Sequence, residues 1–523
     1  MALKEALNRR EFLAPAAAGA AFTILPRHVL GGAGFVAPSD KLAMAHIGCG
    51  TEGLREMASG LIQDPKVQIV SVCDPVKDST SYLDWSKNGI RDSIRRLLAD
   101  SSWGEGVPGI RGGRDPFQQI VQSYYAKNRG SENFKVSAYA DFRELLEKEK
   151  SIDAVKIMTP DHLHATIGVA AMKKGKHVMV HKPLANRMYE ARLVMDTARK
   201  TKVATHFLAY QGNATAERVV ASIKDGVIGP LREVHNWTDR PVWPQFTELP
   251  TDRPPVPAGF DWDLWLGPTL DRPYHPSYTH MVFRSWYDFG GGCIADMGIY
   301  SLWPVFTALN LGPPLSARSW ATHTCHIVDS AATPIVNDFA FPTASIIQFE
   351  YAARADMPPV SVFWYDGGML PRIAELDAEE AAVPPEGLLY VGDKGKILSA
   401  GRGAPRLITA KGSEPLWRET PAQPGAGRGQ AAAGQAASGG RSNVWVEAFQ
   451  GGAPSPGNFL SAGPISETVC LAAVALRAGR QKSGSRSYPA PLKLLYDSAG
   501  MKVTNMAEAN KFLTREYRPG WEL

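Results

Sequence analysis

The chain has 523 residues, of which 44% are hydrophobic and 21% are charged. This composition is ordinary for a soluble globular protein, and the length allows two or more domains with a large core. The formal net charge is only +5 and no run of Lys and Arg is interleaved with aromatic residues, which argues against nucleic-acid binding.

Residues 1–37 predict a twin-arginine export signal. Arg9 and Arg10 precede a small, apolar stretch from Phe12 to Leu25 that is too short to span a bilayer comfortably. This pattern is typical of the route that exports folded cargo. We therefore expect recognition by the twin-arginine translocation machinery, a periplasmic or otherwise exported location, and no stable membrane span. The alternative is a solvated helix with a chance arginine pair.

Residues 41–74 predict a βαβ unit. The run 41–47 is mostly apolar, residues 54–63 have helical spacing, and 67–73 reads as a second strand. The fingerprint Gly48-Cys49-Gly50-Thr51-Glu52-Gly53 lies between the first strand and the helix. That order of strand, glycines and helix indicates a dinucleotide-binding site.

Each glycine of the fingerprint has a physical reason. Gly48 permits a tight turn, Gly50 lets the backbone approach a pyrophosphate, and Gly53 lets the helix pack on the strand. Asp74 lies 21 residues after Gly53, where an acid binds the ribose hydroxyls and repels a 2′-phosphate, so NAD is favoured over NADP. The expected cofactor contacts in the loop are Gly48, Gly50, Thr51, Glu52 and Gly53.

Two later strands end in polar motifs. Residues 153–158 precede Thr159-Pro160-Asp161-His162-Leu163-His164, and 177–181 precede Lys182-Pro183. Because carboxyl ends of parallel strands line the ligand crevice, both motifs fall where chemistry is expected. Residues 78–130 exceed what a strand–helix connection needs, so we interpret them as a surface insertion.

These motifs together resemble the Gfo/Idh/MocA oxidoreductases, a family that includes glucose–fructose oxidoreductase and inositol dehydrogenase. The resemblance extends over nearly all of residues 40–523, and the segments Trp262–Pro268 and Tyr517–Trp521 look like a branch of the family with twin-arginine leaders. The motifs that carry it are the Gly48–Gly53 fingerprint, Thr159-Pro160-Asp161-x-x-His164, Lys182-Pro183, Gly290-Gly291-Gly292 with Asp296, Trp262–Pro268, and Tyr517–Trp521.

The resemblance implies an α/β protein of two domains. An N-terminal Rossmann domain is expected at 38–185, followed by a C-terminal α/β domain at 186–523 with a large open, mainly antiparallel sheet. That sheet often mediates oligomerisation in the family, so a homo-oligomer is expected. Residues 421–442 are low-complexity sequence and predict a surface loop.

The resemblance also assigns roles to site residues. Lys182 inherits contact with the reacting hydroxyl and the nicotinamide ribose, and Thr159, Pro160 and His164 become cofactor contacts. Asp296 matches the family's catalytic Asp, but Tyr300 stands where the family has His, and His181 where it usually has Glu. The catalytic set is therefore expected to be Lys182, Asp296 and Tyr300.

The proton acceptor stays open at this point. Tyr is a poor base at neutral pH unless its phenolate is stabilised, which Lys182 could do by charge. Alternatively, Tyr300 only binds the sugar and His164 or His280 takes the proton, or the redox activity is lost. Substrate contacts are expected from His280, Arg284 and Trp237, since aromatic rings suit the apolar faces of sugars.

The leading hypothesis is an exported NAD-dependent oxidoreductase acting on a hydroxyl of a sugar, glycoside or polyol, with a tightly bound cofactor. The first alternative is a redox-neutral, NAD-dependent glycoside hydrolase that works by oxidation and elimination. The second is a sugar-binding protein with a vestigial cofactor site. No metal site is expected.

Overall fold

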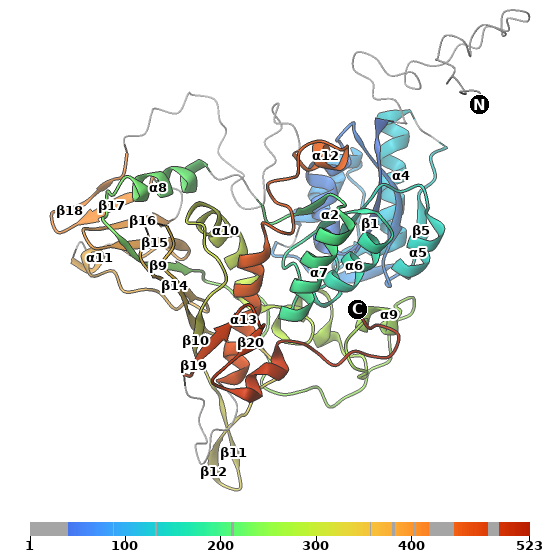
Figure 1. Cartoon of the computed structure of the whole chain (residues 1–523). Helices are drawn as coiled ribbons and strands as arrows, with labels where there is room; N and C mark the ends of the chain where they lie inside the picture. The colour runs from blue at the N-terminus through green and yellow to red at the C-terminus, as the bar shows by residue number, and fades with distance from the viewer. Residues whose placement is uncertain are drawn as a thin grey trace, which may run out of the picture.

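The computed structural model describes residues 40–86, 88–130, 133–210, 214–355, 357–378, 382–400, 404–417, 444–479 and 491–523. Figure 1 shows an amino-terminal α/β unit beside a broad sheet that is flanked by helices. The expected export signal at 1–37 and the low-complexity loop at 421–442 lie outside the described residues. Within the described ranges, no helix combines the length and apolar character that a membrane span requires.

The amino-terminal unit is a Rossmann fold, as the sequence predicts. Its sheet has six strands, all parallel, in the order β5-β2-β1-β6-β7-β8. The strands are β1 (Leu42–Ile47), β2 (Val67–Cys73), β5 (Ser137–Tyr139), β6 (Ala154–Ile157), β7 (His177–Val180) and β8 (Thr205–Phe207). The strand order reverses between β1 and β6, so the ligand crevice is expected at their carboxyl ends.

Helices cover both faces of this sheet, as parallel strands require. They are α2 (Thr51–Glu56) with its π-helical continuation η3 (Met57–Leu61), α4 (Arg114–Arg129), α5 (Phe142–Lys148), the short 3-10 helix η4 (Asp161–Leu163), α6 (His164–Lys173) and α7 (Met188–Thr201), while α3 (Gly89–Leu98) packs outside α2 and α4.

The prediction that 78–130 is a surface insertion is wrong for its second half. Only β3 (Ser79–Tyr82), α3 and β4 (Ile110–Gly112) form an excursion. Helix α4 buries Phe117 and Val121, and Tyr125 accepts a hydrogen bond from the backbone N–H of Ile69 on β2 at 2.8 Å. It is the crossover helix from β2 to β5, and its many charged residues concealed its apolar face in the sequence.

The expected domain boundary at 185 also lies too early. Helix α7 and strand β8 add another parallel repeat, because β8 pairs with β7. Residues up to 207 therefore belong to the first sheet. The sequence signal was weak because β8 has only three residues.

The carboxyl-terminal unit contains a ten-stranded sheet in the order β18-β17-β16-β15-β9-β14-β13-β10-β19-β20. Every pair is antiparallel except β9 with β14, so the sheet is mainly antiparallel, as expected. The strands are β9 (Leu231–Trp237), β10 (Ser316–Ala321), β13 (Ser345–Tyr351), β14 (Val360–Tyr365), β15 (Gly387–Gly392), β16 (Lys396–Ala400), β17 (Arg406–Thr409), β18 (Gly412–Pro415), β19 (Lys493–Asp497) and β20 (Lys502–Val503).

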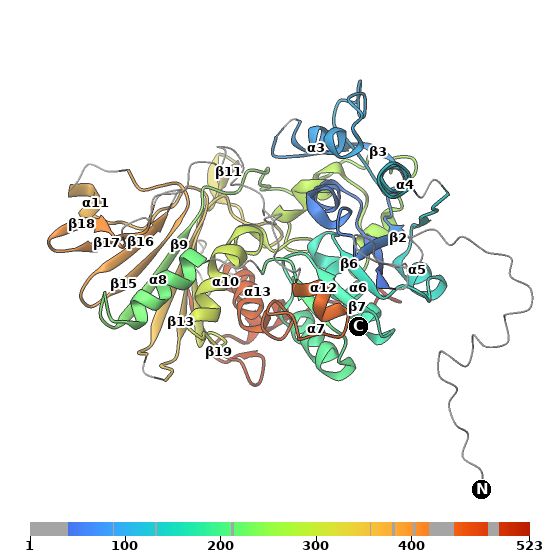
Figure 2. The same ribbon diagram turned by 90° about the horizontal axis from the view of Figure 1, so that it is seen from above.

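Three helices pack on this sheet: α8 (Ala214–Lys224), α10 (Ile299–Ala308) and α13 (Gly463–Ala478). Figure 2 shows α10 and α13 between the broad sheet and the amino-terminal unit. Phe349 of β13, Trp303 of α10 and Leu471 of α13 share one buried cluster with Ala191 of α7. This continuous core holds the two units together.

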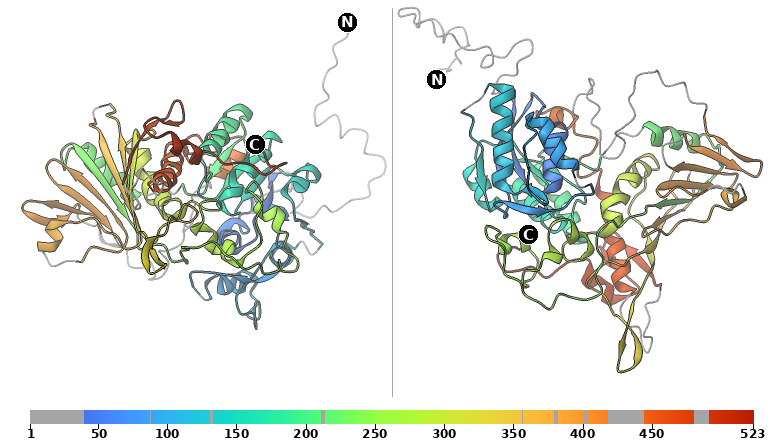
Figure 3. Two further views of the ribbon diagram at one scale, coloured as in Figure 1. Left: turned by 90° about the horizontal axis from the view of Figure 1, so that it is seen from below. Right: turned by 180° about the vertical axis from the view of Figure 1, so that it is seen from behind.

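The remaining elements are mostly short: α9 (Trp262–Leu266), η5 (Pro276–Tyr278), η6 (His280–Ser285), η7 (Ile294–Gly298), β11 (Cys325–Val328), β12 (Ala331–Pro334), α11 (Ala374–Ala378), α12 (Val444–Phe449) and η8 (Ala507–Phe512). Figure 3 shows the hairpin β11–β12 projecting away from the rest of the chain and the carboxyl terminus returning to the amino-terminal unit.

Candidate active site

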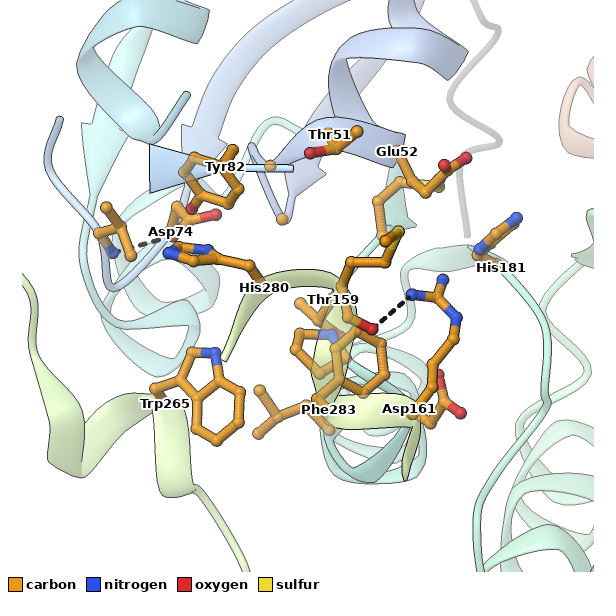
Figure 4. A pocket seen from close by; sticks show the side chains of 18 of the residues that line it. Thr51, Glu52, Asp74, Tyr82, Thr159, Asp161, His181, Trp265, His280 and Phe283 are labelled. Atoms are coloured by element: carbon orange, nitrogen blue, oxygen red, sulfur yellow. Dashed lines mark hydrogen bonds between the residues drawn. The ribbon is translucent and has the colours of Figure 1, made fainter. Parts of the chain in front are cut away.

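A pocket opens at the carboxyl ends of β1, β2, β6 and β7, where the strand order reverses. Its empty volume is about 840 Å³, including space open to solvent. One wall comes from the glycine loop and β2, and the opposite wall from η6 and α9 (Figure 4). Its polar lining residues include Thr51, Glu52, Asp74, Thr159, Asp161, His181, His280 and Arg284.

The glycine loop has no room for side chains where it crosses the sheet. A Cβ on Gly48 would lie 2.5 Å from the carbonyl group of Met158, and one on Gly53 would lie 2.2 Å from the carbonyl oxygen of Gly48. Gly48 also has a φ of +98°, a conformation that favours glycine. The loop therefore presents bare backbone to the pocket, as a dinucleotide pyrophosphate requires.

Asp74 stands at the end of β2 and lines the pocket. Its carboxylate accepts hydrogen bonds from the backbone N–H groups of Cys49, at 2.6 Å, and Val76, at 2.8 Å. Burial raises the pKa of Asp74 to about 6, although the two hydrogen bonds act to lower it. The acid thus connects the glycine loop to β2 and keeps lone pairs for ribose hydroxyls.

The motif after β6, Thr159 to His164, contributes some residues to the pocket lining and others to contacts behind it. Thr159 lines the pocket, and its buried hydroxyl has no hydrogen-bond partner among the described residues. An orphaned donor and acceptor at this place fits a polar ligand. Together with the bare glycine loop and Asp74, it makes the pocket suitable for NAD.

His164 does not line the pocket. Its ring nitrogens lie 2.6 Å from the carbonyl oxygen of Pro183 and 2.9 Å from that of Thr159. The imidazole therefore ties the loop after β6 to the loop after β7. The expectation that His164 contacts the cofactor or takes a proton is not met, because both nitrogens face backbone carbonyls.

Lys182, Asp296 and Arg284 form a buried ion cluster beside the pocket. The Lys182 ammonium hydrogen-bonds the Asp296 carboxylate, and Arg284 Nε donates to the same oxygen at 3.1 Å. Despite burial, these two cations lower the pKa of Asp296 to about 2. The aspartate is consequently an anion at all working pH values, and it fixes both cationic side chains.

Tyr300 and His181 form a second pair next to this cluster. His181 Nε2 lies 3.1 Å from the Tyr300 hydroxyl oxygen. The Lys182 ammonium lies over the ring of Tyr300, 5.7 Å from its centroid, rather than on its hydroxyl. The hypothesis of a Tyr–Lys proton pair therefore gives way to a Tyr300–His181 pair, of which His181 lines the pocket.

Both members of the pair are neutral at physiological pH. Burial raises the pKa of Tyr300 well above its usual value of 10, and nearby carboxylates including Glu56 add to the rise. Burial and the adjacent Lys182 lower the pKa of His181 well below 6.5. The imidazole is thus in its proton-accepting form, while the phenol keeps its proton.

Of the other two expected substrate residues, His280 and Trp237, only His280 lies in the pocket. His280 lines the pocket, with Nε2 3.1 Å from Ser81 Oγ and its ring 4.2 Å from that of Tyr82. Figure 4 shows His280 on the Asp74 side of the pocket. Burial lowers the pKa of His280 to about 4.

Trp237 does not reach the pocket, which corrects the expectation for it. It is 1% exposed and packs with Leu389 and Ile373 in a cluster on the ten-stranded sheet. Its indole N–H donates to the carbonyl oxygen of Pro384 at 2.7 Å. This ring is core.

Other aromatic residues form the pocket wall instead: Trp265, from the Trp262–Pro268 motif, and Tyr82, Trp85 and Phe283, which the sequence did not single out. Trp85 is 41% exposed and lies within 6 Å of the guanidinium groups of Arg284 and Arg240. It belongs to the excursion at 79–112, in a stretch between β3 and α3 without regular secondary structure. In the sequence, His181 stands out only because it occupies the position where the family usually has Glu, which by itself assigns it no role.

Two family models match the chain. Residues 115–208 match the model described as "Oxidoreductase family, NAD-binding Rossmann fold", and 221–312 match "Oxidoreductase family, C-terminal alpha/beta domain". The glycine fingerprint lies ahead of both matched regions, so the pocket geometry supports the cofactor assignment independently.

Relatives with known names match shorter stretches. The levoglucosan dehydrogenase of Pseudarthrobacter phenanthrenivorans is 36% identical over 108 residues, 20% of this chain and 26% of that protein. A glycosyl hydrolase family 109 protein of Shewanella sp. strain ANA-3 is 34% identical over 114 residues, 22% of this chain and 25% of that protein. The chain thus matches about a quarter of the length of these curated relatives.

Among solved structures, the chain is similar to the WlbA dehydrogenase from Bordetella pertussis in complex with NADH and UDP-GlcNAcA. The TM-score is 0.46 at 12% identity, covering 84% of this chain and 97% of that one.

Proposed function

We propose that this chain, which carries the NAD-binding and C-terminal domains of the Gfo/Idh/MocA oxidoreductases, oxidises or reduces a hydroxyl-bearing carbon of a sugar, glycoside or polyol. The observation that carries the proposal is the junction of two sets of residues in one pocket. Asp74 and Thr159 line it on the cofactor side, and His181 and Arg284 line it beside the ion cluster.

NAD, when bound, supplies the hydride acceptor and donor, and this chain's residues supply position and proton transfer. The backbone of the glycine loop would hold the pyrophosphate, Asp74 would accept hydrogen bonds from the ribose hydroxyls, and Thr159 would bond its orphaned hydroxyl to the cofactor. The carboxylate at position 74 would disfavour the 2′-phosphate of NADP.

The proton step falls to the Tyr300–His181 pair. A substrate hydroxyl proton passes to the tyrosine oxygen while the tyrosine proton passes to His181 Nε2, so no free phenolate has to form. The raised pKa of Tyr300 makes a free phenolate costly, and the lowered pKa of His181 leaves its imidazole unprotonated, with a free lone pair for a transient proton. Such a positioned acid/base pair contributes about 10²–10⁴ in rate.

The ion cluster positions the substrate. Asp296 holds the Lys182 ammonium and the Arg284 guanidinium at fixed places, and Arg284 reaches the pocket. Their positive charge favours a developing alkoxide on the substrate oxygen. Trp85, at the pocket rim, offers an aromatic face to a sugar ring.

A second candidate function is redox-neutral glycoside hydrolysis at the same pocket, in which oxidation is followed by elimination and re-reduction. The match to a glycosyl hydrolase family 109 protein supports it, and so does a pair of neutral acid/base groups that could serve both an O–H and a C–H proton. A sugar-binding protein without turnover is the weaker alternative, because a buried ion cluster is more than binding requires.

An exported location reached by the twin-arginine route and assembly into a homo-oligomer belong to the same proposal. They are supported by Arg9-Arg10 and the apolar stretch after them, and by the resemblance, respectively. Export of a folded, cofactor-loaded protein would favour a retained NAD that is recycled within or between turnovers.

The test is an assay of purified protein against aryl glycosides, free sugars and polyols, with and without added NAD. NADH or oxidised sugar without released aglycone supports the oxidoreductase. Aglycone release with no net NADH supports the hydrolase. If the protein neither carries nor binds NAD(H), both enzyme functions fail.

A further inference from the structure

A second cavity lies away from the active site, between α7, α13 and the carboxyl-terminal segment. Its empty volume is about 770 Å³, open to solvent, and none of its lining residues lines the first pocket. Four arginines contribute to it from four separate segments: Arg187, Arg272, Arg477 and Arg515.

The inner part of this cavity has more positive than negative charge. The four guanidinium groups form ion pairs with Asp288 and, behind Arg515, with Glu190, while Asp338 attracts Arg477 from the exposed rim. Two of the four positive charges therefore have no ion-paired carboxylate of their own. Asp338, Glu516 and Lys511 stand at the exposed rim, where water and salt weaken their effect.

The carboxylate of Asp288 is already used. It pairs with Arg187 at 3.3 Å and Arg272 at 2.5 Å, and burial notwithstanding, these arginines lower its pKa to about 2. It has little capacity left for Arg477.

Three of the arginines that line the cavity carry a donor without an acceptor. The Nε atoms of Arg187, Arg272 and Arg477 are buried without a hydrogen-bond partner among the described residues, and Arg187 is only 5% exposed. Arg477 is held between the rings of Tyr287 and Phe512, 5.1 and 4.2 Å from their centroids. Buried donors of this kind are normally satisfied, so the unpaired ones indicate a missing acceptor.

We propose that this cavity is a binding site for a phosphate group, either free or as the monoester of a small metabolite. The guanidinium fork matches tetrahedral oxyanions, a dianion would balance the two unmatched charges, and Thr269 and Thr514 add polar side chains to the cavity wall. The volume exceeds that of phosphate alone, which leaves space for the organic part of a monoester.

The site is connected to the active site through two loops. Asn186 and Arg187 follow Lys182-Pro183 in the chain, and Asp288 precedes the glycines at 290–292. Arg515 donates to the side chain of Asn186 and, at 3.4 Å, to the backbone carbonyl oxygen of Asp288. A bound phosphate would hold the arginines and thereby both loops, so it is expected to stabilise the fold and the cofactor-loaded enzyme.

The test is calorimetric titration of the full chain, saturated with NADH so that the glycine loop is filled, with inorganic phosphate and separately with glycerol phosphate. Ionic strength is matched with sodium chloride. Saturable binding of either probe, with a rise in the unfolding midpoint of about 2 °C or more, supports the site. Tighter binding of the ester identifies a metabolite rather than free phosphate as the source.

Three variants locate the binding. Arg477→Gln removes one unmatched charge and is expected to weaken phosphate binding about tenfold or more, whereas Arg199→Gln, on the exposed face of α7, should not change it. Thr514→Glu places a carboxylate in the cavity and should raise the unfolding midpoint without phosphate while abolishing binding. No binding of either probe, an effect reproduced by chloride, or equal binding by wild type and Arg477→Gln would overturn the proposal.

Discussion

His181 Nε2 and the hydroxyl oxygen of Tyr300 lie 3.1 Å apart, on the loop after β7 and at the start of α10. The family that the sequence resembles has Glu and His at these two positions. This chain thus has a carboxylate (Asp296), an ammonium (Lys182) and an imidazole near the pocket. The imidazole, however, is at position 181 and not at position 300, where the family has it. The acid/base chemistry proposed here depends on this contact.

Changing Tyr300→Phe removes the hydroxyl and keeps the ring. We expect kcat to fall by about 10²–10⁴, since a positioned acid/base group contributes that much, with KM nearly unchanged. Steady-state kinetics on the best substrate of the panel measures both. A raised KM with unchanged kcat would reduce Tyr300 to a binding residue.

The double variant His181→Glu with Tyr300→His restores the family's residues at both positions. It should recover activity relative to either single variant, because the two groups work as one hydrogen-bonded unit. Purely additive losses would show that the residues are not coupled.

Changing Lys182→Met removes the ammonium from the ion cluster. We expect kcat/KM to fall by about 10²-fold or more, because the substrate oxygen loses its positive neighbour. The Kd for NADH, measured by fluorescence titration, should stay within about threefold of wild type. Lys176→Met, which removes a lysine from the loop before β7, is the matched control. A loss confined to NADH affinity would contradict the assigned role.

Changing Asp74→Asn tests the cofactor preference. In the wild type, the backbone N–H groups of Cys49 and Val76 donate to different oxygens of Asp74. The amide of asparagine has a single oxygen, so one of these hydrogen bonds is lost, and the neutral side chain no longer repels a 2′-phosphate. We expect NADH binding to weaken about tenfold and the ratio of NADPH to NADH affinity to rise. An unchanged ratio would mean that another group sets the preference.

Trp85 is expected to bind the sugar ring. Trp85→Ala should raise KM about tenfold with kcat unchanged, because a lost aromatic face costs binding and not proton transfer. Trp85→Phe keeps an aromatic face and should stay close to wild type. If Ala and Phe behave alike, the residue is not a sugar platform.

Stability should fall unusually early on acidification. Burial lowers the pKa of His162 and His206 to about 3 and that of His280 to about 4, so the unfolded chain binds protons that the folded chain refuses. Stability from these groups is complete above pH ~6.5 and is lost as the pH falls from there toward ~3.

Two buried acids act in the opposite direction in part of that window. Burial raises the pKa of Asp74 and Asp366 to about 6, so their contribution grows as the pH falls from ~6 toward ~4. The histidines outnumber them and dominate. Urea unfolding between pH 7 and pH 4 measures the sum, and constant stability across this range would contradict the burial of these histidines.

The sequence predicted the parts of the fold that repeat a strong pattern. Apolar strands followed by glycines, by Thr-Pro or by Lys-Pro placed β1, β6 and β7, and the family resemblance implied the mainly antiparallel sheet of the second unit. It missed the role of α4 because Arg114, Lys127 and Arg129 surround its apolar face. It placed the first domain's end too early because β8 is only three residues long.

The sequence predicted a site residue correctly where a motif determines the backbone position. It failed where side-chain packing or hydrogen bonding determines whether the residue faces the pocket. Asp74 lies in the pocket because β2 ends there. His164 and Trp237 do not, because carbonyl groups and a buried cluster satisfy them first. Trp85 enters the pocket from an irregular excursion, and nothing local in the sequence encodes that approach.

The most direct test of the proposed cofactor site is an NADH titration of purified, cofactor-stripped full-length protein, followed by nicotinamide fluorescence. We predict saturable binding of one NADH per chain that is weakened in Asp74→Asn and retained in Tyr300→Phe. Absence of NADH binding by folded wild-type protein would contradict the proposal that this pocket holds a nicotinamide cofactor beside the ion cluster of Lys182, Asp296 and Arg284.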